Sequence, residues 1–210
     1  MDAVSLMVSV PVCSFRKPYA REFFETERIP PPATVYGFLL SLIGEEDRNV
    51  YLGTKLAIAV IDQPVVSTIL RTTWRIKSKA PPGTGNNKKP DYQEILTGLK
   101  IFVCVGDCDL ASKLTGSCKS PHDIARYGGL SLGESRDLVN DITFNPVLAD
   151  HMGSWLLPDE TGKLPLPVWV DHVGSKGTVW KQFSLLQRNL EPPVSGDARW
   201  ILIENLRKFH

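Results

Sequence analysis

Between Glu25 and Gly44 the chain reads Glu-Thr-Glu-Arg-Ile-Pro-Pro-Pro-Ala-Thr-Val-Tyr-Gly-Phe-Leu-Leu-Ser-Leu-Ile-Gly. The apolar residues at positions 35, 38, 39, 42 and 43 have the spacing of a helix that buries one face. Proline suits the first turn of a helix because its φ is already helical, and glycine commonly follows the last turn. The pattern therefore predicts an amphipathic helix over Pro30–Gly44, packed against the core.

Gly37 interrupts this helix, and a glycine inside a helix costs about 1 kcal/mol relative to alanine. We expect a ligand or a neighbouring segment to lie close to the backbone there. The amino end of the helix also has unpaired N–H groups and a partial positive charge, which favour phosphate. An ordinary first helix with a proline cap explains the same pattern.

Composition excludes several classes of protein. The 210 residues are enough for one large domain or a domain with a subdomain, and 42% of them are hydrophobic. The formal net charge is only +1, so nucleic-acid binding would depend on local basic clusters. No apolar run is long enough to span a membrane, and the acidic N-terminal residues do not resemble a signal peptide. With only four sparse cysteines, these features predict a reduced, cytoplasmic protein without membrane contact.

Strand-like and helix-like segments alternate through the first 145 residues. Strands are predicted over 4–12, 55–61, 65–79, 93–105 and 139–144. Short helices are predicted over 109–114 and over 120–127, where Ser120 would be the N-cap. This order predicts an α+β fold with a ferredoxin-like or RRM-like domain over 1–145. Prolines, aromatic residues and short strand patterns predict a small C-terminal β-rich extension over 146–210.

Residues 71–100 predict a protruding β-hairpin, or thumb, with a basic face and tip. The basic residues of its face and tip are Arg71, Arg75, Lys77, Lys79, Lys88 and Lys89. Trp74 falls on the opposite face of the first strand. Basic residues near aromatic ones suit a phosphate backbone with splayed bases, whereas lysines on an edge strand also block aggregation. Both interpretations of the hairpin fit the sequence.

A glycine-rich loop from Tyr127 to Arg136 is a second candidate site. Gly128, Gly129 and Gly133 would let backbone amides approach a phosphate or a sugar. The loop matches neither a P-loop nor a dinucleotide-binding fingerprint. A cluster of β-turns is the alternative interpretation.

Motifs for catalysis and for metal binding are weak. There is no Gly-x-Ser-x-Gly sequence and no helix-borne His-Glu pair. His172 and Lys176 share a glycine-rich turn, which leaves open a metal-free ribonuclease with a His or Tyr base. The cysteines lack the C-x₂-C spacing usual for zinc, and Cys104 lies in an apolar strand. We therefore predict no metal and no cofactor.

Two motifs in the first two-thirds of the chain resemble those of a known family. The strand over 4–12 is followed by Phe15-Arg16-Lys17-Pro18, then by Glu25-Thr26, then by the run from Pro30 to Leu39. Leu130-Ser131-Leu132-Gly133-Glu134-Ser135 resembles a Leu-Gly-Arg/Glu loop, although the basic residue comes later here, at Arg136. These motifs are similar to those of the CRISPR-associated Cas family 5 proteins of the RAMP superfamily.

The resemblance implies an RRM-like domain with a thumb, in a non-catalytic subunit of a type I CRISPR Cascade complex. Such a subunit binds and caps the 5′ handle of the crRNA. It implies contacts with the Cas family 7 backbone subunit and the Cas family 8 large subunit, and only indirect contact with target DNA. Some family members cut precursor crRNA with a Tyr, a Lys and a His, but this sequence has no adjacent Lys-His pair. The alternatives are a metal-free endoribonuclease that processes precursor crRNA and a generic RRM-like RNA-binding protein.

We expect three regions to bind the RNA, weakly and in a salt-sensitive way when the protein is isolated. Around the predicted helix these residues are Arg16, Lys17, Arg21, Arg28, Tyr36 and Gly37. On the hairpin they are Arg71, Trp74, Arg75, Lys77, Lys79, Lys88 and Lys89. In the glycine-rich loop they are Gly128, Gly129, Gly133 and Arg136.

Overall fold

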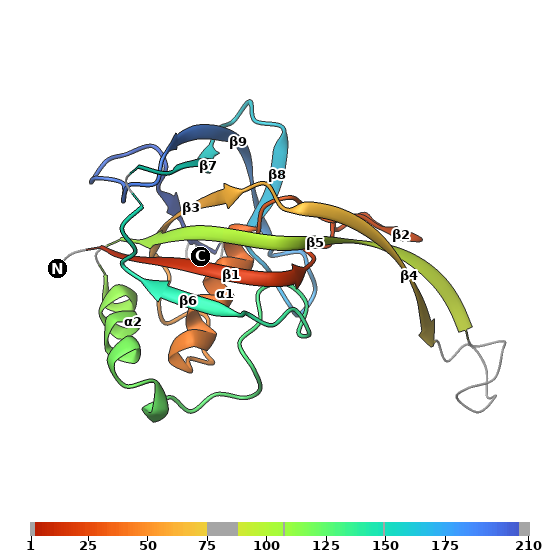
Figure 1. Ribbon diagram of the computed structural model, residues 1–210, viewed down its shortest axis with the longest axis horizontal. Helices are drawn as coiled ribbons and strands as arrows, with labels where there is room; N and C mark the ends of the chain where they lie inside the picture. The colour runs from red at the N-terminus through yellow and green to blue at the C-terminus, as the bar shows by residue number, and fades with distance from the viewer. Residues whose placement is uncertain (1–2, 75–87, 107, 149, 206–210) are drawn as a thin grey trace.

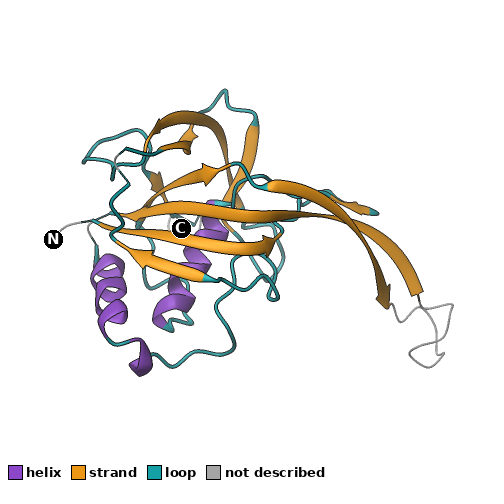
Figure 2. Ribbon diagram, in the orientation of Figure 1, coloured by secondary structure: helices purple, strands orange, loops and turns teal. Residues whose placement is uncertain are grey.

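The computed structural model describes residues 3–74, 88–106, 108–148 and 150–205. Within these residues, ten strands form one sheet, and two α-helices and a 3-10 turn accompany it. The elements are β1 (Val4–Cys13), β2 (Phe23–Phe24), α1 (Pro32–Ile43), β3 (Lys55–Asp62), β4 (Val65–Trp74), β5 (Lys88–Val105), α2 (Asp109–Lys119), η2 (Pro121–Asp123), β6 (Asp141–Phe144), β7 (Met152–Pro158), β8 (Leu164–Trp169), β9 (Val179–Asn189) and β10 (Ile201–Leu202). Figure 2 shows both helices on the same side of this sheet.

The sheet begins with the strand order β6-β1-β5-β3, and each neighbouring pair is antiparallel. The strands predicted over 4–12, 55–61, 93–105 and 139–144 are therefore confirmed, with small shifts at their ends. The helix predicted over 120–127 is wrong. Its residues form only the short η2 turn, because none of the η2 residues is buried and so no apolar face stabilises a longer helix.

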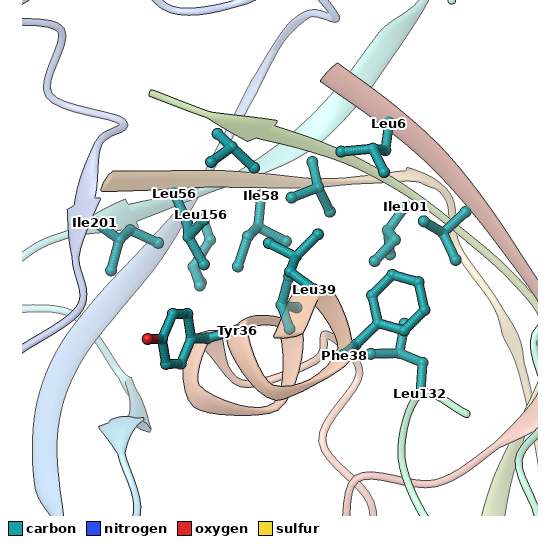
Figure 3. Close-up of a cluster of buried hydrophobic side chains, with 14 of the residues drawn as sticks. Leu6, Tyr36, Phe38, Leu39, Leu56, Ile58, Ile101, Leu132, Leu156 and Ile201 are labelled. Carbon is teal, nitrogen blue, oxygen red and sulfur yellow. The ribbon is translucent and has the colours of Figure 1, made fainter. Parts of the chain in front are cut away.

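Helix α1 is the helix predicted from the apolar spacing, and it packs its apolar face against the central strands (Figure 3). It starts at Pro32 rather than Pro30, because a residue that precedes a proline is pushed out of the helical region; Pro31 has ψ 143°. Gly44 ends the helix with φ 73°, and its N–H donates to the Leu40 and Ser41 carbonyls. The predicted glycine stop is confirmed.

The C-terminal β-rich residues continue the same sheet. Strand β7 pairs with β3 at Ala59 and Val60, and β9 and β8 follow it outward. Strand β8 packs against α1, where Trp169 lies 6.3 Å from Tyr36 between ring centroids. The residues after 145 therefore share the core of the first part of the chain.

Strands β4 and β5 form the long hairpin predicted from the sequence (Figure 1). Their pairing runs from Val65↔Thr97 to Trp74↔Lys88, so the hairpin begins before Arg71. The second half of β5 lies in the centre of the sheet, whereas its first half and β4 project from the body (Figure 1). We call residues 65–74 and 88–97 the arm.

The face of the sheet away from α1 carries a second, smaller core. Phe102 of β5 meets Trp155 of β7 edge-on, with 5.8 Å between the ring centroids. The Arg199 guanidinium covers Trp155 at 4.5 Å and is hydrogen-bonded to Asp197, so residues 190–200 are fixed over this face. None of the helices described is long and apolar enough to cross a membrane.

Candidate nucleic-acid interface

A pocket of about 550 Å³ lies where four segments of the chain meet: the loop after β1, the start of α1, the glycine-rich loop and the β8–β9 region. The residues that line it include Arg16, Tyr19, Thr34, Gly133, Glu134 and Trp180. Three of these four segments were selected separately from the sequence, and the fold brings them to one place.

The loop after β1 is held in position by Thr26. Its hydroxyl accepts the Phe15 N–H (2.8 Å) and donates to the Glu27 carbonyl (3.1 Å). Its own N–H donates to the Glu94 carboxylate of β5 (3.0 Å). Because Thr26 is buried, these bonds fix the path of the loop, and the conspicuous Glu-Thr pair of the sequence has a structural explanation.

Arg16 is exposed beside the pocket, and its guanidinium stacks on the buried Phe24 ring at 3.9 Å from the centroid. The same guanidinium donates to the Ala20 carbonyl at 3.0 Å. Both contacts limit the rotamers of this long side chain. A positive charge is therefore presented at the pocket at a reduced entropic cost of ordering.

The glycine-rich loop is anchored at both sides of its turn. Leu132 is fully buried in the core beside Phe38 (Figure 3). The buried Asp137 carboxylate accepts the N–H groups of Ser14 (2.9 Å) and Glu134 (2.8 Å). Burial raises the pKa of Asp137, while these two hydrogen bonds act in the opposite direction.

Gly133 is required by this arrangement. Its φ is +123°, and a Cβ at this position would lie 2.6 Å from Asp137 Oδ2 and 2.9 Å from the Ser14 carbonyl oxygen. The glycine therefore permits a close approach between the loop and the end of β1. In this structure its role is to let the loop pack, which also holds Glu134 at the pocket.

Two arginines from different segments share one pair of acceptors, and we call this group the arginine cluster: Arg71, Gln93, Glu134 and Arg136. The buried Gln93 Oε1 accepts hydrogen bonds from Arg71 Nη1 and from Arg136 Nη2 (2.9 Å). Glu134 Oε2 lies 3.0 Å from Arg136 Nη2 and 3.6 Å from Arg71 Nη1. The arm and the glycine-rich loop are thus joined by charged groups next to the pocket.

A second pocket of about 410 Å³ follows the exposed side of α1. Gly37 lines it, together with Arg48, Arg126, Tyr127 and His172. Both pockets are lined by Thr34 and Val170, and we call the two together the groove. Apart from its own helix, no described residue lies within 4 Å of a Cβ placed on Gly37, so the neighbouring segment expected there is absent and the space is open.

Two of the sequence predictions need correction. Tyr36 is fully buried, and its hydroxyl donates to the Arg48 carbonyl (2.8 Å), so its side chain does not reach the surface. Burial raises the pKa of Tyr36 to about 12. The start of α1 also supplies fewer phosphate donors than predicted, because Pro31 and Pro32 have no N–H and the Thr34 N–H donates to the Pro31 carbonyl.

The other predicted residues are dispersed around the groove. Lys17 faces Glu25 at 3.7 Å, whereas Arg21 and Arg28 are exposed on the same loop without lining the two pockets. At the start of β5, Lys88 pairs with Trp74 across the hairpin, and Lys89 lies 3.4 Å from Glu22. Exposed Gly128 and Gly129 precede the turn. Arg75, Lys77 and Lys79 lie outside the described residues.

Sequence reasoning missed two exposed aromatic residues of the pocket, Tyr19 and Trp180. Tyr19 directly follows the Phe-Arg-Lys-Pro motif, which is a signal that would have found it. Trp180 comes from β9, and only the tertiary structure brings β9 to this pocket.

Among the residues that the structure describes, no group of three or more His, Cys, Asp or Glu side chains is arranged to hold a metal ion, and the cysteines form no such group. Cys13 and Cys104 are buried, and burial raises the pKa of each thiol to about 12. Cys118 is exposed at the end of α2.

Comparisons with known proteins identify the fold from solved structures and the family from one relative. No protein-family model matches the sequence. One chain in a solved structure described as a CRISPR RNA-guided surveillance complex has the same fold, with a TM-score of 0.61, 15% identity and 90% of each chain covered. Another, described as a Cas protein, has a TM-score of 0.53 and 13% identity, and covers 90% of this chain and 94% of its own. A CRISPR-associated protein Cas5 of Myxococcus xanthus (strain DK1622) is 42% identical over 213 residues, which are 96% of this chain and 98% of that protein. This chain is therefore a member of the CRISPR-associated Cas5 family.

Proposed function

We propose that the protein is a non-catalytic subunit of a type I CRISPR Cascade complex, and that it binds and caps the 5′ handle of the crRNA. The observation that carries this proposal is the groove, which unites Arg16, the glycine-rich loop and the exposed side of α1. Membership of the Cas5 family supports it. The similarity in fold to a chain of a CRISPR RNA-guided surveillance complex agrees with it.

The chemistry of the groove suits single-stranded RNA. Arginines beside it provide charge for phosphates, and the exposed rings of Tyr19, Tyr127 and Trp180 provide surfaces on which bases stack. Acidic residues such as Glu27 and Glu134 lie among them, which limits non-specific attraction. Binding by the isolated chain is therefore weak and salt-sensitive, and partner subunits complete it.

A generic RRM-like protein would use the open face of its sheet for RNA. The strand order β6-β1-β5-β3, with α1 between β1 and β3 in the chain and α2 between β5 and β6, supports a ferredoxin-like or RRM-like core. On the face away from the helices, however, Phe102 is covered by Trp155. This favours the groove over the sheet as the RNA site.

We propose that the arm is the thumb of the family and that it contacts the Cas family 7 backbone subunit. The Cas family 8 large subunit docks beside the protein, and target DNA is met only through the assembled complex in the cytoplasm. These partners follow from the family, and the projecting hairpin is the feature that fits them.

The proposed absence of catalysis is supported by the position of Tyr36. A tyrosine that acts as a base needs a reachable hydroxyl, whereas this one is buried and bonded to a carbonyl oxygen. His172 is exposed at the second pocket and is the residue to test for the alternative, a metal-free endoribonuclease.

Co-expression with its operon tests the proposal. The protein should co-purify with a crRNA and with a multi-copy backbone subunit, and it should leave a repeat-derived RNA intact in the absence of metal. Arg16→Gln should weaken binding of the repeat-derived 5′ end and reduce the salt slope by about 1. Arg28→Gln, on the same loop but outside the groove, is the matched control and should bind as the native protein does. Cleavage of the RNA, or purification without crRNA and backbone subunit, would overturn the proposal.

A further inference from the structure

The arginine cluster contains two guanidinium groups but only one carboxylate between them. Arg71 comes from the arm and Arg136 from the glycine-rich loop, and both face Glu134 Oε2, at 3.6 and 3.0 Å. A second acid, the buried Asp137, is held nearby by the N–H groups of Ser14 and Glu134, so Glu134 is the carboxylate that lies between the two guanidinium groups at the edge of the pocket.

We propose that the Glu134 carboxylate occupies the place of an RNA phosphate between Arg71 and Arg136, and that RNA displaces it on binding. This inference rests on the proposed RNA-binding function. A carboxylate and a phosphodiester both present two acceptor oxygens to the planar N–H groups of a guanidinium, so each can bridge the two arginines. Glu134 then acts as an internal competitor that neutralises the site until RNA arrives.

The position of Gln93 makes this exchange feasible. Gln93 is 1% exposed, and its Oε1 accepts a hydrogen bond from each of the two arginines. Its Nε2 donates to Glu134 Oε1 at 2.9 Å, and this is the one Gln93 bond that is lost when the carboxylate leaves. Its Nε2 donates to Ser14 Oγ at 2.8 Å, which ties the amide to the end of β1. When the carboxylate leaves, Gln93 keeps the two guanidinium groups in place.

The accessibility of the charged groups also fits displacement. The side chains of Glu134 and Arg71 are 31% and 29% exposed, and that of Arg136 is 53% exposed. A partly exposed ion pair of this kind contributes little net stability. A multivalent RNA that gains several phosphate contacts can therefore replace it.

The test measures the affinity of the full-length protein for a short single-stranded RNA with the repeat-derived 5′ end. Glu134→Gln keeps the shape of the side chain and an acceptor for the Gln93 amide but removes the competing charge. It should bind the RNA about three- to tenfold more tightly. It should also lower the melting temperature of the RNA-free protein by about 1–3 °C, because an ion pair is lost.

Asp62→Asn is the matched control. It removes an acidic charge that pairs with Lys100 at 4.0 Å, at a 70% exposed side chain outside the cluster, so affinity should change less than twofold. In an Arg71→Gln/Arg136→Gln background, Glu134→Gln should give no gain. Glu134→Ala serves as a second variant if Glu134→Gln does not fold.

The outcomes separate this inference from the proposed function. If the native protein does not bind the RNA, the proposed function fails. If the native protein binds it but Glu134→Gln binds equally or more weakly, Glu134 is only a structural acceptor and the displacement model is wrong. An equal gain in Asp62→Asn would show that the effect comes from net charge alone and would also overturn the model.

Discussion

Two substitutions of Gly37 test separately how this residue affects the stability of α1 and whether RNA passes along the groove. A Cβ on Gly37 would meet no atom within 4 Å, and the residue lies inside a helix. Gly37→Ala should therefore stabilise the protein by about 1 kcal/mol, the difference in helix propensity between the two residues. For a chain of this size, that corresponds to a rise of about 2–4 °C in melting temperature.

Gly37→Leu extends the same test into the groove. The leucine side chain enters the pocket of about 410 Å³ without a clash at its Cβ, so the protein should still fold. If RNA passes along this side of α1, the side chain fills the space it needs. The crRNA that co-purifies with the protein from an operon co-expression should then fall by at least about tenfold, which corresponds to 1.4 kcal/mol.

Gly116 in α2 provides the matched control, because a Cβ there also meets no atom within 4 Å and the residue does not line either pocket of the groove. Gly116→Ala should stabilise the protein similarly, and Gly116→Leu should retain crRNA fully. Calorimetry and quantification of bound RNA measure both pairs. If Gly37→Ala lowers the stability, the space above Gly37 is not open. If Gly37→Leu retains crRNA fully, RNA does not pass along α1.

Three further predictions concern stability and reactivity. Gly133→Ala should lower the free energy of unfolding, measured in urea, by about 2–3 kcal/mol, because its Cβ would collide with the Ser14 carbonyl. Gly128→Ala, where only the positive φ is unfavourable, should lower it by about 1 kcal/mol. Equal losses in the two variants would refute the close approach at Gly133. The hydrogen bond from Arg199 lowers the pKa of Asp197 to about 2, whereas the unfolded value is near 3.9. This pair therefore stabilises the protein fully above about pH 4, and the stabilisation is lost as the pH falls toward 2. Arg199→Gln should therefore cost about 2 kcal/mol at pH 7 through this pair, and the difference in stability from the native protein should shrink toward pH 2. The part that comes from the contacts of Arg199 with Trp155 and the Glu191 carbonyl should remain, and a difference independent of pH would contradict the linkage. In the native protein, a thiol reagent should label Cys118 at once and the two buried cysteines only after unfolding; rapid labelling of all four would show that β1 and β5 open readily.

The sequence was sufficient for the elements that its local pattern specifies. The apolar spacing of α1 and the alternation of β1 predicted these elements correctly, because each packs one face against the core. The number of prolines before α1 misled the prediction of a phosphate site, since the residues that start the helix are the ones that lack amide donors.

The candidate site was less predictable, because the residues that hold its arginines in place are far apart in the sequence and belong to no recognisable motif. Gln93 is an unremarkable polar residue in a strand until the fold places it beside Ser14, 79 positions away. Tyr36 was misassigned for the opposite reason. An aromatic residue in a motif suggested a ligand contact, whereas its ring fills the space between α1 and Trp169.

Strand β5 has a mechanical consequence. Its 18 residues run without a break from the end of the arm into the centre of the sheet, where β1 and β3 hold it on both sides. The ten residues from Lys88 to Thr97 span roughly 33 Å at the rise of an antiparallel strand. Strand β2 and the arginine cluster hold the arm at Tyr92 and Gln93, so only the part beyond Tyr92 can bend without breaking these contacts with the body. A force applied beyond this point is carried by the strand backbone into the interior of the body.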